Sequence, residues 1–243
     1  MSEPRPTVRL LHTSDIHLTD RPSSAEGLAG AIDVAIGHAV DVVLIAGDLF
    51  DHPRVGPAAL ELALEQFARI ALPIIVIPGN HDQVDHNSPY HRFDLGQAGP
   101  HVVFAGEAEG RRVVFDDIRL AVWARGIHDH TPRHQPLLGY GPAPLGYWDV
   151  VLTHGHFVSD TERSDRSSRI TQSEIARLEC DYVALGHWHH FVDVSTGGVP
   201  AYYSGSPSEP GIDYPSVSVV TLDDPAGASV ERVAVARSSL VRD

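Results

Sequence analysis

Short apolar runs alternate with helix-like segments through the first third of the chain. Three such runs have the Val, Ile and Leu content of buried parallel strands, and they lie at 8–12, 41–46 and 73–77. After the first run, Ser23 and Glu26 have the spacing of a helix capping box, and apolar residues follow at helical intervals. A second helical pattern precedes the third run. This alternation predicts βαβ units, right-handed crossovers and a parallel sheet.

The pattern changes in the middle of the chain. Three short runs separated by Gly or acidic turns predict a meander, at 102–105, 111–115 and 118–123. The stretch 126–146 is rich in His, Pro and Gly without periodicity, so we expect a long surface loop there. Further strands are predicted at 149–153, 182–185, 191–194, 201–203, 216–222 and 230–236. Thr171 and Glu174 form a second predicted capping box, with a helix running to Leu178.

Composition then excludes several classes of protein. The 18 basic residues are all arginine and face 32 Asp and Glu, which gives a formal charge of −14. No apolar run is long enough to span a bilayer, and the lone Cys180 cannot form an internal disulfide. With no apolar signal core at the N-terminus, we expect a cytoplasmic protein without membrane association. Because no repeat or linker divides the chain, residues 1–243 are predicted to form a single domain.

Metal-ligand residue types follow five of the apolar runs at their carboxyl ends. They are Asp15, His17, Asp48, Asn80, His81, His154, His187 and His189. In open α/β sheets, sites assemble at this edge because strands fix positions while loops supply side chains. Asp15 and Asp48 are 33 residues apart, and Asp48 and Asn80 are 32 apart. Each interval is about one βαβ unit, so adjacent strands would place these residues side by side.

The types of donor atom favour transition metals. Carboxylate, imidazole and amide donors suit Mn²⁺, Fe²⁺, Co²⁺ or Zn²⁺ better than Mg²⁺ or Ca²⁺, which prefer shells of oxygen. Eight candidate ligands exceed what one ion needs, so the pattern predicts two divalent metal ions with one bridging carboxylate. We expect manganese ahead of iron, zinc or cobalt. Such a pair suits in-line displacement at phosphorus.

Five ordered segments resemble the motifs of the calcineurin-like metallophosphoesterases. They are Asp15-x-His17, Gly47-Asp48-x-x-Asp51, Gly79-Asn80-His81-Asp82, His154 after an apolar run, and Gly186-His187-x-His189. Within that superfamily, the stretch 8–207 is most similar to bacterial DNA-repair exonuclease subunits of the SbcD type. The resemblance implies an α/β fold, a four-layer α/β/β/α sandwich of two mixed sheets flanked by helices. The additional C-terminal DNA-capping region of those nucleases is missing, so we expect no separate capping domain.

The resemblance also implies a role for each motif residue. Two ligand sets would share Asp48, one being Asp15, His17, Asp48 and His189 and the other Asp48, Asn80, His154 and His187. A hydroxide between the ions would attack phosphorus. His81 would stabilise the phosphoryl oxygens or protonate the leaving group, and Asp51 would orient His81.

Several residues near these motifs are weaker candidates. Substrate contact is considered for Arg163, Arg166, His156 and His190. The planar guanidinium groups of the two arginines bind phosphate well, and the two histidines flank candidate ligands. A solvated loop and local hydrogen bonds are the competing interpretations. His12, inside the first run, is expected to be a core histidine. The loop histidines His128, His130 and His134 are expected to be solvated.

Taken together, the motifs predict a dinuclear metal-dependent phosphoric ester hydrolase that cleaves phosphodiesters and resembles a DNA exonuclease. A phosphomonoesterase or a small-nucleotide phosphodiesterase stays open, because the metal centre is common to all of them. A protein-interaction scaffold is the alternative from another class, and the filled ligand positions argue against it. The expected partner is a phosphate-ester substrate. The net charge disfavours extended contacts with nucleic acid, although two divalent ions would make the pocket locally positive. The oligomeric state stays open.

Overall fold

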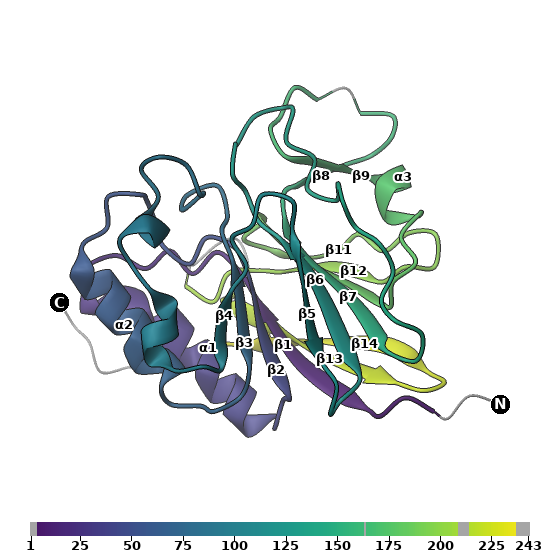
Figure 1. Cartoon of the computed structure of the whole chain (residues 1–243), viewed down its shortest axis with the longest axis horizontal. Helices are drawn as coiled ribbons and strands as arrows, with labels where there is room; N and C mark the ends of the chain where they lie inside the picture. Colours follow the sequence, from purple (N-terminus) through teal and green to yellow (C-terminus); the bar gives the residue numbers. More distant parts are fainter. Residues whose placement is uncertain (1–3, 163, 209–213, 237–243) are drawn as a thin grey trace.

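Two six-stranded mixed sheets pack face to face in the described part of the molecule (Figure 1). The computed structural model describes residues 4–162, 164–208 and 214–236, so the predicted substrate contact Arg163 lies outside the described residues. The strand order is β14-β13-β1-β2-β3-β4 in the first sheet and β11-β12-β10-β7-β6-β5 in the second. None of the helices in these residues has the length and apolar character needed to cross a lipid bilayer.

The first sheet has a parallel centre. Its parallel strands are β1 (Val8–Thr13), β2 (Val42–Ala46), β3 (Ile74–Ile77) and β4 (Val102–Phe104), and its antiparallel strands are β13 (Ser216–Asp223) and β14 (Gly227–Ala234). The predicted βαβ units are confirmed, with α1 (Glu26–Gly37) and α2 (Pro57–Phe67) as the crossover helices. The predicted meander is wrong for its first strand. The segment before β4 returns over the sheet through two 3-10 turns, η2 (Pro89–His91) and η3 (Leu95–Ala98), so β4 pairs parallel with β3.

The second sheet also has parallel strands at its centre. These are β6 (Leu120–Arg125), β7 (Trp148–His154), β10 (Tyr182–Gly186) and β12 (Ala201–Ser204), with β5 (Arg111–Phe115) and β11 (Phe191–Asp193) antiparallel at the edges. The capping box of Thr171 and Glu174 is confirmed, but α3 (Gln172–Ile175) ends before Leu178 because the chain tightens into 3-10 type turns. The short parallel pair β8 (His156–Val158) and β9 (Arg169–Thr171) was not predicted.

The capping box predicted at the start of α1 is wrong. Residues Pro22–Ala25 form a 3-10 turn, η1, and no side chain caps α1. The Ser24 hydroxyl accepts a hydrogen bond from Thr19 N (3.0 Å) and donates to Arg21 O (2.7 Å). Ser24 therefore fixes the loop that precedes the helix, and it does not cap the helix.

Alternating positions give the first sheet two buried faces. In β2, Leu44 and Ala46 pack between the sheets, whereas Val43 and Ile45 pack under α1 and α2. The outer face of the second sheet is covered by α3, the β8–β9 pair and the loop 126–146, which contributes Leu137. The predicted α/β class with two mixed sheets is confirmed, and the fourth layer contains little helix.

His12 is a buried core histidine, as predicted. Its Nε2 donates to Leu185 O (3.1 Å), so its Nδ1 accepts from the Tyr182 hydroxyl (2.9 Å). Burial lowers the pKa of His12 to about 3, only partly opposed by the Leu185 carbonyl and Asp15. The His12 ring is therefore neutral in the folded protein at neutral pH.

Acid should destabilise the protein through His12. Below the unfolded pKa of about 6.5, the unfolded chain binds a proton that the folded chain excludes, so stability falls as the pH drops from about 6.5 towards 3. Between pH 7 and pH 5, the wild type should lose about 2 kcal/mol more unfolding free energy than His12→Gln. Urea denaturation at several pH values measures this difference. Parallel pH profiles for the two proteins would contradict it.

Candidate metal centre

The carboxyl ends of the parallel strands bring all the predicted ligand residues into one site. From the first sheet come residues after β1, β2 and β3, namely Asp15, His17, Asp48, Asn80 and His81. From the second sheet come residues at or after the ends of β7 and β10, namely His154, His187 and His189. Three groups have donor atoms within 4.8 Å of one another: Asp15, His17 and His189; His17, Asp48 and His81; Asp15, Asp48 and His154.

Four of these residues have left-handed backbone conformations. The φ angles are 55° at Asp15, 56° at His17, 53° at Asp48 and 116° at His187. Residues other than glycine rarely adopt such angles, and they persist where the surrounding structure imposes them, typically at functional sites. The backbone therefore sets the direction of these side chains, a feature that motif spacing alone does not reveal.

Asp15 presents one engaged oxygen and one open oxygen. Its Oδ2 accepts hydrogen bonds from Ser14 Oγ (2.5 Å) and His187 N (3.1 Å). Its Oδ1 is buried without a hydrogen-bond partner and lies 3.5 Å from His189 Nε2. Burial opposes the charge, but His154, His189 and the Ser14 hydroxyl together lower the pKa of Asp15. A buried carboxylate oxygen without a donor fits a cation.

His154 presents a nitrogen lone pair to oxygen atoms. Its Nδ1 donates to Ala46 O (2.8 Å), which leaves the lone pair on Nε2. That nitrogen lies 2.9 Å from Asn80 Oδ1 and 3.5 Å from Asp48 Oδ2. His187 Nδ1 lies 2.8 Å from the same Asn80 oxygen. Because the His154 lone pair and the Asn80 oxygen are both acceptors and repel each other, this arrangement also fits a cation between them.

Asp48 lies between the two ends of the site. Its Oδ1 accepts from His81 N (2.8 Å), while its Oδ2 faces His154. Burial raises the pKa of Asp48 well above its usual range, and the nearby Asp15 and Asp82 carboxylates add to the shift. Bound cations would supply the positive charge that balances these buried carboxylates. This geometry is consistent with the predicted bridging role.

His81 lies at the exposed rim of the site. Its Nδ1 donates to the backbone carbonyl of Asp51 (2.7 Å), and its ring lies edge-on to His17 with 4.6 Å between centroids. The Asp51 carboxylate instead faces His17, with 3.3 Å between Oδ1 and Nδ1. Asp51 thus contacts His81 through its peptide group, and its side chain is placed to orient His17.

Asp82 has a role that the sequence analysis missed. Its Oδ1 accepts from Gly79 N (2.7 Å), and its Oδ2 accepts from Phe50 N (3.0 Å) and the Tyr90 hydroxyl (2.6 Å). The side chain is fully buried. Asp82 therefore ties the loop after β2 to the loop after β3. The only sequence signal was its position at the end of the Gly-Asn-His-Asp segment.

Gly79 is a position where an added methyl group should weaken metal binding. A Cβ there would lie 2.1 Å from Asp48 Oδ1, so Gly79→Ala should displace that carboxylate. We expect Mn²⁺ affinity to fall about 10- to 100-fold, as it does when groups that orient ligands are disturbed. Gly37→Ala is the control, because nothing lies within 4 Å of a Cβ at Gly37. Calorimetric titration measures both affinities, and equal values would contradict the packing argument.

Among the predicted substrate contacts, His156 is the most constrained. Trp188 Nε1 donates to His156 Nδ1 (3.0 Å), which places the proton of the neutral ring on Nε2. The His156 ring lies 5.6 Å from that of His187, and burial followed by the nearby Arg166 charge lowers the pKa of His156. Arg166 itself is exposed. His190 is half-buried beyond His189, and the described structure shows no ring contact between it and a candidate ligand.

Three loop histidines are not solvated as expected. His128, His130 and His134 are half-buried, and burial lowers the pKa of each, to about 4 for His134. His130 lies 6.4 Å from His187 between ring centroids, at the edge of the site. These histidines are half-buried because the loop 126–146 packs against the second sheet through Leu137 instead of extending into solvent.

Comparisons with known proteins agree with this arrangement. Residues 8–191 match the family model described as calcineurin-like phosphoesterase. The chain is 33% identical over 210 residues to "DNA double-strand break repair protein Mre11" of Archaeoglobus fulgidus, which covers 75% of this chain and 46% of that protein. It is 26% identical over 231 residues to a subunit of the nuclease SbcCD from Staphylococcus saprophyticus, covering 82% and 60% respectively.

The solved structures show a likeness of fold. A novel archaeal phosphodiesterase aligns with a TM-score of 0.55 and 16% identity, over 93% of this chain and 99% of that one. The chain spans about half the length of the curated relatives it matches. The single-domain organisation therefore stays a prediction.

Proposed function

The chain belongs to the calcineurin-like phosphoesterase family of hydrolases, whose members depend on two metal ions, and we propose that it cleaves phosphodiester bonds. The observation that carries this proposal is the convergence of carboxylate, amide and imidazole donors at one edge of both sheets, with Asp48 between them. This donor set suits a pair of transition-metal ions.

Two overlapping ligand sets would hold the ions. One is Asp15, His17, Asp48 and His189, and the other is Asp48, Asn80, His154 and His187. The open Asp15 Oδ1 and the His154 lone pair are the features that fit them best. When bound, such ions lower the pKa of water and stabilise charge on phosphoryl oxygens. We expect manganese first, then iron, zinc or cobalt.

His81 is placed to transfer a proton. Because its Nδ1 is held by the Asp51 carbonyl, the protonated ring carries its second proton on Nε2. As the bond between phosphorus and the leaving oxygen breaks, that proton passes to the leaving oxygen. The edge-on contact with His17 keeps the His81 ring beside the candidate ligands.

Arg166 and His156 are proposed to contact the substrate phosphate. Arg166→Ala should raise KM for a phosphodiester about fivefold while kcat stays the same, since an exposed guanidinium contributes a modest charge-assisted hydrogen bond. Arg133→Ala, on the exposed part of the neighbouring loop, is the matched control. Steady-state kinetics decide this, and an unchanged KM in Arg166→Ala would refute the contact.

DNA cleavage of the exonuclease type is the first specific form of the proposal. It is supported by the names of the relatives, a DNA repair protein and a nuclease subunit. A substrate panel on the Mn²⁺-loaded protein tests it, with single- and double-stranded DNA, cyclic and linear small phosphodiesters, and a monoester. We expect diesters to be hydrolysed faster than the monoester. Hydrolysis of the monoester alone would refute the diesterase, and hydrolysis of nothing under several metals would refute the proposed activity altogether.

A further inference from the structure

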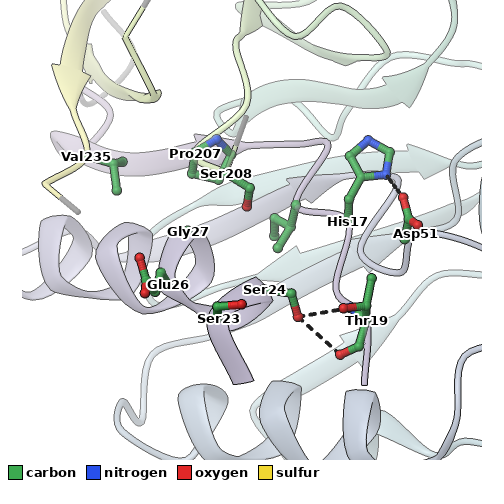
Figure 2. Close-up of a pocket in the computed structure, with 11 residues that line it drawn as sticks. His17, Thr19, Ser23, Ser24, Glu26, Gly27, Asp51, Pro207, Ser208 and Val235 are labelled. Atoms are coloured by element: carbon green, nitrogen blue, oxygen red, sulfur yellow. Dashed lines mark hydrogen bonds and ion pairs between the residues drawn. The ribbon is translucent and has the colours of Figure 1, made fainter. Parts of the chain in front are cut away.

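A cavity of about 440 Å³ opens beside the candidate metal centre (Figure 2). We call it the α1 cavity, because residues before and at the start of α1 line it, including Ser23, Ser24 and Glu26. Figure 2 shows His17 and Asp51 at one end and Val235 at the other. The cavity is therefore continuous with the site and large enough for a small organic group.

Two residues that line the α1 cavity contact His81. His17, which lines the cavity, packs edge-on against His81, and Asp51, its neighbour in the lining, holds His81 Nδ1 through its carbonyl. His81 is the group placed to protonate the leaving oxygen. A leaving group at that oxygen would therefore extend into the α1 cavity, an inference that rests on the proposed function.

The described lining carries hydroxyl and carboxylate groups and no arginine. The Ser24 hydroxyl is engaged with the loop at Thr19, so the hydroxyl that faces a ligand is that of Ser23, and the carboxylates are those of Glu26 and Asp51. Glu26 lies in the first turn of α1, where the helix dipole favours its negative charge. No described residue donates a hydrogen bond to the Glu26 carboxylate or forms an ion pair with it. The Asp51 side chain, which also lines the cavity, is 41% exposed.

We propose that the α1 cavity binds an uncharged, hydroxyl-bearing leaving group, such as a nucleoside, and selects against a leaving group that carries a second phosphate. Carboxylates accept hydrogen bonds from sugar hydroxyls, and serine hydroxyls both donate and accept them. The same carboxylates repel a phosphate brought close to them. The protein then prefers a dinucleoside monophosphate to a diester whose leaving side continues into further phosphates. The cavity therefore favours a small-nucleotide phosphodiesterase over DNA cleavage of the exonuclease type.

Thymidylyl-thymidine tests this preference directly. The Mn²⁺-loaded protein is assayed with this diester and with the two forms that carry an extra terminal phosphate at one end or the other. We expect kcat/KM to be highest for the plain diester. It should be lower for the form that carries its extra phosphate on the leaving nucleoside, because that phosphate would enter the cavity. Glu26→Gln should reduce that preference about three- to tenfold, because one of the two carboxylates is lost. Glu65→Gln, an exposed glutamate on α2, should leave it unchanged.

The outcomes separate this assignment from the proposed function. If the plain diester is hydrolysed but Glu26→Gln keeps the wild-type preference, the cavity assignment is overturned and the proposed function stands. If no diester is hydrolysed with any of the four metals, the proposed function fails and the leaving-group role fails with it. A binding measurement without turnover checks the cavity itself. Thymidine should shift the amide NMR signals of Ser23 and Gly27 more than thymidine bisphosphate does, and the reverse order would overturn the assignment.

Discussion

Asp48→Asn is expected to lower kcat for phosphodiester hydrolysis on the order of a thousandfold, the loss that corresponds to several kcal/mol of metal-ion catalysis. Asp48 is the residue shared by the two candidate ligand sets, and its Oδ2 faces His154 across 3.5 Å. An amide cannot supply the bridging negative charge, so bound Mn²⁺ should also fall below two ions per chain. Kinetics and elemental analysis of the same preparation measure both effects.

The stability of this variant separates lost chemistry from lost folding. An asparagine can still accept the hydrogen bond from His81 N, and burial already disfavours the carboxylate charge, as the raised pKa of Asp48 indicates. Without metal, Asp48→Asn should therefore unfold at the same temperature as the wild type or a higher one. Asp117→Asn, an exposed carboxylate in the turn between β5 and β6, is the control. Full metal content together with full turnover in Asp48→Asn would refute the bridging role.

His81→Gln should show the second large effect, and only with poor leaving groups. For diesters that release an alkyl alcohol, kcat should fall about 10²- to 10⁴-fold, the usual contribution of a general acid. For a p-nitrophenyl diester the fall should be less than about tenfold, since p-nitrophenolate leaves without a proton. Single-turnover rates for both substrates give the comparison, with His86→Gln, an exposed histidine, as the control. Equal losses on the two substrates would show that His81 acts by another route.

The first-sheet half of the site could be predicted from local pattern. Asp15, Asp48 and Asn80 each follow a buried strand, and their intervals match one βαβ unit, so parallel pairing of β1, β2 and β3 places them side by side. The half of the site on the second sheet could not be predicted in this way, because no local spacing in the sequence indicates that the end of β7 lies against β2. The contact of His154 Nδ1 with Ala46 O depends on tertiary packing and was not predicted. The place of His154 at a strand end made it a candidate ligand, and the resemblance implied that it shares an ion with Asp48.

The capping prediction that is wrong, and the unpredicted way in which Asp51 contacts His81, both depend on contacts between distant segments. Ser24 bonds to the loop at Thr19, so the local capping pattern of Ser23 and Glu26 is not used. Asp51 reaches His81 through its carbonyl, whereas its carboxylate turns to His17. In each case the local sequence allows more than one contact, and the packing of the loops decides which one forms.

The two-metal centre is tested most directly by anomalous X-ray diffraction from crystals of the Mn²⁺-loaded protein. Two anomalous peaks about 3.5–4 Å apart are expected, with Asp48 in contact with both. A single peak, or two peaks of which neither touches Asp48, would contradict the centre proposed for this protein.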